Sequence, residues 1–246
     1  MTVTFASSLL VLLLLTWAAL LVGGLLIDFG GRTARNRLPL AARMATSAML
    51  TAAALVWWLG ATRGTALAGY GLLIFAGMTL GFLGDLVMAK VIRTPNRVIF
   101  GMLAFGGGHL CYIAAFLGLG RALAKQSGAP LAPLVAIWAV YAAASALLWY
   151  TLIRQPARGR ALNIGTLVYA VLIGAMAGSA MWLATAQPGL LPLALGGLLF
   201  IASDMFVGSE LMRGTSFRSI GDVIWTTYTV AQFLIVYSTA IVLQIV

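Results

Sequence analysis

Long runs of apolar residues follow one another along the whole chain, separated by short gaps that carry arginine, lysine, glycine or proline. Each run is long enough to cross a bilayer, which takes roughly 20 helical residues. In lipid the backbone polar groups must be satisfied within the segment, so the runs are predicted to be helices. They lie near residues 5–27, 42–60, 66–89, 98–119, 131–153, 161–185, 190–211 and 219–245.

The composition supports this interpretation and sets the fold class. The chain is 62% hydrophobic and 8% charged, whereas a soluble domain carries about 25% charged residues. We therefore expect an all-α polytopic membrane protein, a bundle of about eight transmembrane helices. The gaps are too short for a second folded unit, so residues 1–246 are predicted to form a single transmembrane helical domain.

The basic residues define a topology rather than a nucleic-acid partner. The formal net charge is +10, but arginine and lysine gather in the gaps after the first, third, fifth and seventh runs, whereas Arg63, Arg121 and Lys125 lie in the other gaps. By the positive-inside rule both termini are expected outside the cytoplasm. The first run lacks the charged start and cleavage site of a secretory signal, so we interpret it as a retained helix. This predicts an integral, multi-pass protein of a bacterial-type inner or plasma membrane.

Two carboxylates interrupt the apolar runs. Asp85 lies five residues before Lys90 and Asp204 nine before Arg213, which places them about 7 Å and about 13 Å from the interface at 1.5 Å per helical residue. An intramembrane carboxylate is costly and usually faces a cavity or a partner. We therefore expect Asp85 and Asp204 to share one polar cavity in the cytoplasmic half.

The other three acids have simpler interpretations. Asp28 follows the first run and is expected to be solvated. Glu210 lies three residues before Arg213 and is expected to pair or to reach the interface. Asp222 begins the last helix, where the helix dipole favours a carboxylate, and capping is its expected role.

Further polar side chains fall into register with the expected cavity. His109 and Tyr112 are three residues apart and Tyr228 and Gln232 are four apart, so each pair shares a helix face. Tyr169 lies in the sixth run. A lone buried histidine is as often a hydrogen-bonded core residue as a functional one. Gly77 and Gly81 form a small-residue packing face.

A short internal similarity allows a duplication. "FLGDLVMAK" at 82–90 and "IASDMFVGS" at 201–209 both place an aspartate after a small residue and before bulky apolar ones. Because four helices separate the two stretches, their helices would run parallel, and a four-plus-four repeat is geometrically allowed.

The ordered set of these motifs resembles the lysoplasmalogenase (YhhN-like) family of integral membrane proteins. The resemblance rests on "GDLVM", "GHLCYIAAF", "LVYAVLIGAM", "ASD" and "YTVAQFL". Gly108 stands where an alanine is expected, and the first two helices carry no motif. The resemblance implies an eight-helix fold. It also implies hydrolysis of the vinyl ether bond of lysoplasmalogens with a choline or ethanolamine head group, giving a fatty aldehyde and a glycerophospho-alcohol. The essential aspartates would be Asp85 and Asp204.

The chemistry of that reaction fits two carboxylates. A proton must reach carbon to give an oxocarbenium-like cation, and water must follow. Two carboxyl groups in one cavity titrate as a unit, so one of Asp85 and Asp204 would donate the proton while the other stabilises the cation and activates water. The residues expected to orient water and the carboxylates are His109, Tyr112, Tyr169, Tyr228 and Gln232. No metal or organic cofactor is required.

The substrate would be a lysophospholipid drawn from membrane lipid; protein partners cannot be inferred. Lys90 and Arg93, with Arg97, border the mouth near Asp85 and could contact the phosphate if that gap is helical. Two alternatives stay open. Paired intramembrane acids also serve proton-coupled transporters, although no proline interrupts the middle of the helices that carry the motifs. A non-catalytic lipid-binding protein is the other alternative.

Overall fold

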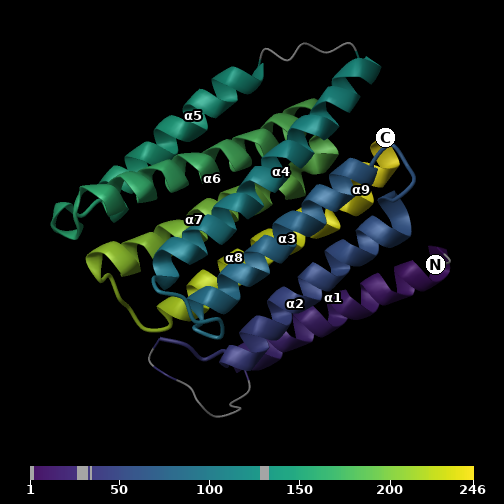
Figure 1. Cartoon of the computed structure of the whole chain (residues 1–246). Helices are drawn as coiled ribbons and strands as arrows, with labels where there is room; N and C mark the ends of the chain where they lie inside the picture. Colours follow the sequence, from purple (N-terminus) through teal and green to yellow (C-terminus); the bar gives the residue numbers. More distant parts are fainter. Residues whose placement is uncertain (1–2, 27–32, 34, 128–132) are drawn as a thin grey trace.

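The computed structural model describes residues 3–26, 33, 35–127 and 133–246. Within these ranges every regular element is a helix, and eight helices are long and apolar enough to cross a membrane (Figure 1). The predicted all-α polytopic membrane fold is therefore confirmed. The four-plus-four repeat stays a prediction.

The long helices match the predicted spans closely. They are α1 (Val3–Leu26), α2 (Leu40–Trp57), α3 (Ala68–Met88), α4 (Arg97–Ser127), α5 (Pro133–Leu148), α6 (Arg160–Ala186), α7 (Leu191–Arg213), α8 (Ile220–Tyr237) and α9 (Thr239–Ile245). Single π-helical turns, Trp58–Thr62 and Trp149–Ile153, extend α2 and α5.

Two boundaries differ from the prediction for identifiable reasons. The predicted helix 98–119 runs on to Ser127, because the following residues include alanine, leucine, lysine and glutamine, which favour helix even where the apolar run has ended. The predicted helix 219–245 is divided into α8 and α9 at Ser238, whose hydroxyl donates to the Leu234 carbonyl. A side-chain bond of this kind to the preceding turn often bends a helix.

Most helices pack against the next helix along the chain, and α8 contacts helices from both halves of the sequence. The pairs α1–α2, α3–α4, α5–α6 and α7–α8 are in contact, α6 lies against α4 and α7, and α8 also reaches α2 and α3. Figure 1 shows α5 on the outside of the bundle, beside α6. From α1, the Trp17 indole donates to Thr229 in α8 and stacks on Phe233 at 5.0 Å between ring centroids.

Glycines bring α3 and α4 close together. A Cβ added at Gly108 would lie 3.0 Å from the Gly77 carbonyl oxygen, and one added at Gly84 would lie 2.8 Å from the Phe105 ring. Glycine allows such an approach of two helices. This crossing holds Asp85, one residue after Gly84, at a defined place in the bundle. Of the two glycines predicted to form one packing face, Gly77 lies against Tyr112 of α4, whereas Gly81 lies against side chains of α8.

The end of the bundle that carries most arginines is tied together by contacts between loops and helices. The Arg213 guanidinium donates to the Arg154 carbonyl at 2.9 Å, and Arg158 donates to the Met212 carbonyl. Arg35 forms an ion pair with Glu210, as expected for a glutamate near the interface that seeks a cation.

One expectation at this end is wrong. Asp222 does not cap its own helix. Its buried carboxylate accepts the backbone N–H groups of Arg37 and Leu38, at 2.8 and 3.0 Å. The reason is tertiary: the chain entering α2 brings unsatisfied N–H groups to the start of α8. Asp28 lies outside the described residues.

Candidate active site

A cavity of about 560 Å³ opens at the arginine-rich end, among α2, α3, α4, α6, α7 and α8. Both intramembrane aspartates line it, together with Tyr169, Tyr228 and Arg43. The sequence prediction that Asp85 and Asp204 face one cavity agrees with this arrangement. The two carboxylates come from α3 and α7, which are far apart in the sequence. Only the packing of the bundle brings them to the same cavity.

Asp85 is held by hydroxyl groups from two other helices. Its Oδ2 accepts a hydrogen bond of 2.6 Å from Ser47 in α2 and one of 3.0 Å from Tyr228 in α8. The Gln232 amide in turn donates to the Tyr228 hydroxyl oxygen at 2.7 Å. Gly81 leaves room for this network, because a Cβ there would lie 3.2 Å from the Gln232 amide nitrogen and 3.4 Å from the Tyr228 oxygen.

Asp204 has a different environment. The Tyr169 hydroxyl donates to its Oδ2 at 3.1 Å, and Nε2 of His109 lies 3.9 Å from the same oxygen. That separation is too long for a hydrogen bond. His109 is buried, and neither ring nitrogen has a hydrogen-bond partner among the described residues. Asp204 is also more exposed than Asp85.

An aromatic wall joins the two aspartate environments. The Phe200 ring in α7 lies edge-on to His109 at 5.0 Å and to Tyr228 at 5.4 Å. Tyr112 packs beside Phe200 at 6.4 Å, and its buried hydroxyl has no partner among the described groups. The predicted orienting residues therefore gather around the two carboxylates, with His109, Tyr112 and Gln232 behind the cavity surface.

Two predicted binding residues lie elsewhere. Lys90 and Arg93 are exposed, and neither is among the described residues that line the cavity. The condition that the gap be helical is not met: α3 ends at Met88, and Lys90 takes a left-handed conformation with φ of 62°. Of the three basic residues in this gap, Arg97 at the start of α4 lines the cavity.

The sequence interpretation missed two residues of α2. Ser47 bonds to Asp85, and Arg43 lines the same cavity one helical turn away. Their spacing of four residues puts both on one face of a predicted membrane helix, and this spacing could have indicated a polar face toward the cavity. It was overlooked because no family motif falls on this helix.

Most of the remaining cavity wall is apolar. The side chains come mainly from α4, α6 and α7, and they include Met102, Phe105, Ala170, Met205 and Leu211. Charged groups also line it, so the cavity offers both polar and apolar contacts. An amphipathic ligand would match both.

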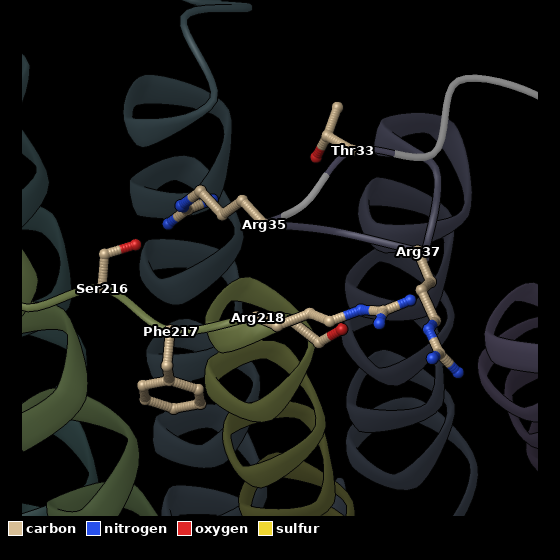
Figure 2. Close-up of a pocket in the computed structure, with 7 residues that line it drawn as sticks. Thr33, Arg35, Arg37, Ser216, Phe217 and Arg218 are labelled. Carbon is tan, nitrogen blue, oxygen red and sulfur yellow. The ribbon is translucent and has the colours of Figure 1, made fainter.

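A second pocket of about 710 Å³ adjoins the first (Figure 2). It is lined by Thr33, Arg35, Arg37, Ser216, Phe217, Arg218 and Ser219. Arg35 belongs to both pockets and donates two hydrogen bonds to Glu210, at 2.6 and 2.7 Å. These hydrogen bonds raise the pKa of the Arg35 guanidinium above its ordinary value, against a smaller opposing effect of burial. Three arginines, and no acidic residue, are among the described residues that line this second pocket.

Comparison with known proteins identifies a family and two named relatives that this chain resembles. Residues 38–239 match the model of the YhhN family. Two proteins named lysoplasmalogenase, from Mycobacterium bovis (strain ATCC BAA-935 / AF2122/97) and Mycobacterium tuberculosis (strain CDC 1551 / Oshkosh), are each 33% identical to this chain over 139 residues. The matched stretch covers 56% of this chain and 49% of each relative, so the chain spans about half the length of the curated relatives it matches. No solved structure matches.

Proposed function

We propose that this chain, which belongs to the YhhN family, is a membrane-embedded hydrolase that cleaves the vinyl ether bond of lysoplasmalogens. The products would be a fatty aldehyde and a glycerophospho-alcohol. One observation carries the proposal: carboxylates from two helices line one cavity whose wall combines charged and apolar side chains. The names of the two mycobacterial relatives support the choice of substrate.

The reaction adds one water to R–CH=CH–O–R′ and yields R–CH₂–CHO and R′–OH. A proton is transferred to the alkene carbon remote from oxygen, which leaves an oxocarbenium ion. Water adds to that ion and loses a proton, giving a hemiacetal. The hemiacetal hydroxyl then gives up its proton and its oxygen forms the aldehyde C=O, while the C–O bond to glycerol breaks. The glycerol oxygen leaves with that bond's electron pair and takes up a proton. The enzyme must therefore supply one acid and one base.

Asp85 suits the acid role. Both hydroxyl donors, Ser47 and Tyr228, bond to Oδ2, and Oδ1 accepts no hydrogen bond from the described residues. In the protonated acid, Oδ2 would then act as the carbonyl oxygen. A proton on Oδ1 would not be shared with a described protein group, and it would be available for transfer to the substrate carbon.

Asp204 suits the base role. It is the more exposed of the two carboxylates, so it can meet water, and its charge would stabilise the oxocarbenium ion. Tyr169 fixes its Oδ2. His109, 3.9 Å away, is within a small movement of a hydrogen bond, and catalytic contacts are often long before substrate binds.

The apolar lining residues of the cavity would hold the alkenyl chain. They include Met102, Phe105 and Met205, and apolar walls exclude bulk water from the reacting bond, which strengthens the electrostatic effect of both carboxylates. The charged lining residues at the arginine-rich end would hold the head group. This orientation matches that of a lysolipid in the adjoining leaflet.

An assay of aldehyde release tests the proposal. The purified full chain in detergent is given choline and ethanolamine lysoplasmalogens, with a saturated-ether lysolipid as the uncleavable control. Wild type is expected to release aldehyde only from the vinyl ethers, and Asp85→Asn and Asp204→Asn are each expected to lower the rate at least about 100-fold.

Absence of aldehyde above the blank with both substrates would refute the hydrolase. Full activity in both asparagine variants would instead refute the two-aspartate mechanism. Counterflow of labelled lysolipid in proteoliposomes, without aldehyde release, would favour the transporter alternative.

A further inference from the structure

We propose that Arg43 in α2 binds the phosphate of the lysophospholipid head group inside the cavity. The inference deepens the proposed function and rests on it for the identity of the substrate. It moves phosphate recognition away from Lys90 and Arg93, which lie outside the cavity, to a residue that lines it together with both aspartates.

The Arg43 guanidinium forms no direct ion pair with a described residue, although Asp222 and Asp85 attract it from a greater distance. Its Nε is buried and has no hydrogen-bond partner among the described residues. Among the same residues, the only ion pair formed by an arginine is that of Arg35 with Glu210. Arg43 is half-buried, and a partly buried cation without a direct ion pair is stabilised by a bound anion. The Asp85 carboxylate does not contact the guanidinium directly, since no ion pair joins the two, and its Oδ2 is bonded to Ser47 and Tyr228.

The guanidinium is also held in position. It lies over the Trp225 ring, with 5.8 Å from its central carbon to the ring centroid. The Trp225 indole N–H donates to Thr46 at 3.0 Å, and the Thr46 hydroxyl donates to the Arg43 carbonyl at 2.7 Å. An arginine that is pre-positioned in this way loses less conformational freedom when it binds an oxyanion.

The spacing along α2 matches the substrate. Arg43 lies one helical turn before Ser47, the residue that donates to Asp85, and a helical step of four residues is about 6 Å along the axis. In the glycerol backbone, five bonds separate the vinyl ether oxygen from phosphorus, an extended span of about 6 Å at ordinary bond lengths. A phosphate at Arg43 would therefore place the vinyl ether at the level of Asp85.

The surroundings favour a lipid phosphate over free phosphate. The same cavity has apolar lining residues that would bind an alkenyl chain, a contact that free phosphate cannot make. Arg97 also lines the cavity and donates to the Met88 carbonyl at 3.3 Å. It lies at the exposed start of α4 and can contact the head group from the outside.

A binding experiment separates this inference from the hydrolase proposal. Calorimetry on the purified full chain in detergent compares a saturated-ether lysophospholipid, which cannot be cleaved, with the alkylglycerol of the same chain length and with inorganic phosphate. The proteins are wild type, Arg43→Gln, Arg43→Lys and the control Arg121→Gln, which removes an exposed charge of α4 outside the cavity.

Wild type is expected to bind the lysophospholipid about 10- to 100-fold more tightly than the alkylglycerol, the value of a charge-assisted hydrogen-bond pair. Arg43→Gln should remove that margin without changing alkylglycerol affinity. Arg43→Lys should keep part of the margin, and Arg121→Gln all of it.

The inference fails if wild type shows no margin, if Arg43→Gln keeps it, or if inorganic phosphate binds as tightly as the lysophospholipid. If Arg43→Gln does not fold, Arg43→Lys decides: an undiminished margin there overturns the specific role of the guanidinium. An Arg43-dependent margin without any aldehyde release would sink the hydrolase proposal and leave the phosphate site standing.

Discussion

The Tyr228 hydroxyl in α8 donates a hydrogen bond of 3.0 Å to Oδ2 of Asp85 in α3, across 143 positions of sequence. Gln232, one turn further along α8, donates to the same hydroxyl oxygen and so orients it toward the carboxylate. A donor fixed in this way sets the direction in which Asp85 presents its other oxygen. The proposed acid is thus positioned by a helix that is not its own.

Tyr228→Phe is therefore expected to lower kcat about 10- to 100-fold, with little change in KM, because one hydrogen bond to the reacting carboxyl is worth about 1–3 kcal/mol. Steady-state kinetics of aldehyde release measures the effect. Tyr70→Phe is the matched control: it removes a buried hydroxyl of α3 that has no partner among the described residues. A Tyr228→Phe enzyme with wild-type kcat would contradict the positioning role.

Ser47→Ala should remove the second hydrogen bond to Oδ2 of Asp85. We expect a loss of kcat similar to that of Tyr228→Phe, and a double variant less impaired than the product of the two single effects, because both hydroxyls bond to one oxygen. Ser145→Ala, which removes a buried hydroxyl without a partner among the described residues, should leave the rate unchanged. Strictly multiplicative effects would argue that the two donors act independently.

Gly81→Ala is expected to disturb the site without unfolding the bundle. Its Cβ would lie 3.2 Å from the Gln232 amide nitrogen and 3.4 Å from the Tyr228 oxygen, so these groups must shift by a few tenths of an ångström. We expect a clear loss of kcat and a small change in melting temperature. In α4, Gly118→Ala has no atom within 4 Å of the new Cβ and should be neutral or stabilising by up to about 1 kcal/mol. Equal activity of the two variants would show that Gly81 provides no needed space.

The Arg35–Glu210 ion pair joins the segment before α2 to α7, at 2.6 Å between Nε and Oε1. The side chains are 46% and 21% exposed, so solvent screens the pair and its contribution to stability should be no more than about 1 kcal/mol. A double-mutant cycle with Arg35→Gln and Glu210→Gln, read as melting temperature in detergent, measures it. The coupling should shrink as salt is raised to about 1 M, where the Debye length is about 3 Å. A coupling free energy that is larger than this and does not change with salt concentration would mean that the pair is effectively buried.

Asp204→Ala and Asp85→Ala should respond differently to added formate. A small carboxylate can replace a base that activates water, so formate is expected to restore part of the Asp204→Ala activity, about 10-fold or more above its unrescued rate. It should not restore Asp85→Ala, since at neutral pH formate is ionised and supplies no proton. Acetate, which is larger, serves as the size control. Rescue of Asp85→Ala alone would exchange the two proposed roles.

The sequence by itself determined the number of spanning helices and their approximate limits. Length, continuity and apolar character decide whether a segment crosses lipid, and all three are local properties. It also singled out Asp85 and Asp204, because a carboxylate inside an apolar span stands out without any knowledge of its neighbours.

The contacts of those carboxylates were decided only by the tertiary structure. Ser47 and Arg43 lie on α2, whose sequence carries no unusual charge pattern at those positions, and they matter because α2 packs against α3 and α8. Lys90 and Arg93 were predicted to bind substrate from their sequence position alone. They lie outside the cavity because α3 ends at Met88 and the chain takes a left-handed turn at Lys90. Asp222 bonds to a segment far away in sequence. The hydropathy of a segment depends on its own residues alone. A hydrogen bond or an ion pair between helices depends on the relative position of two segments, and side-chain packing between the helices sets that position.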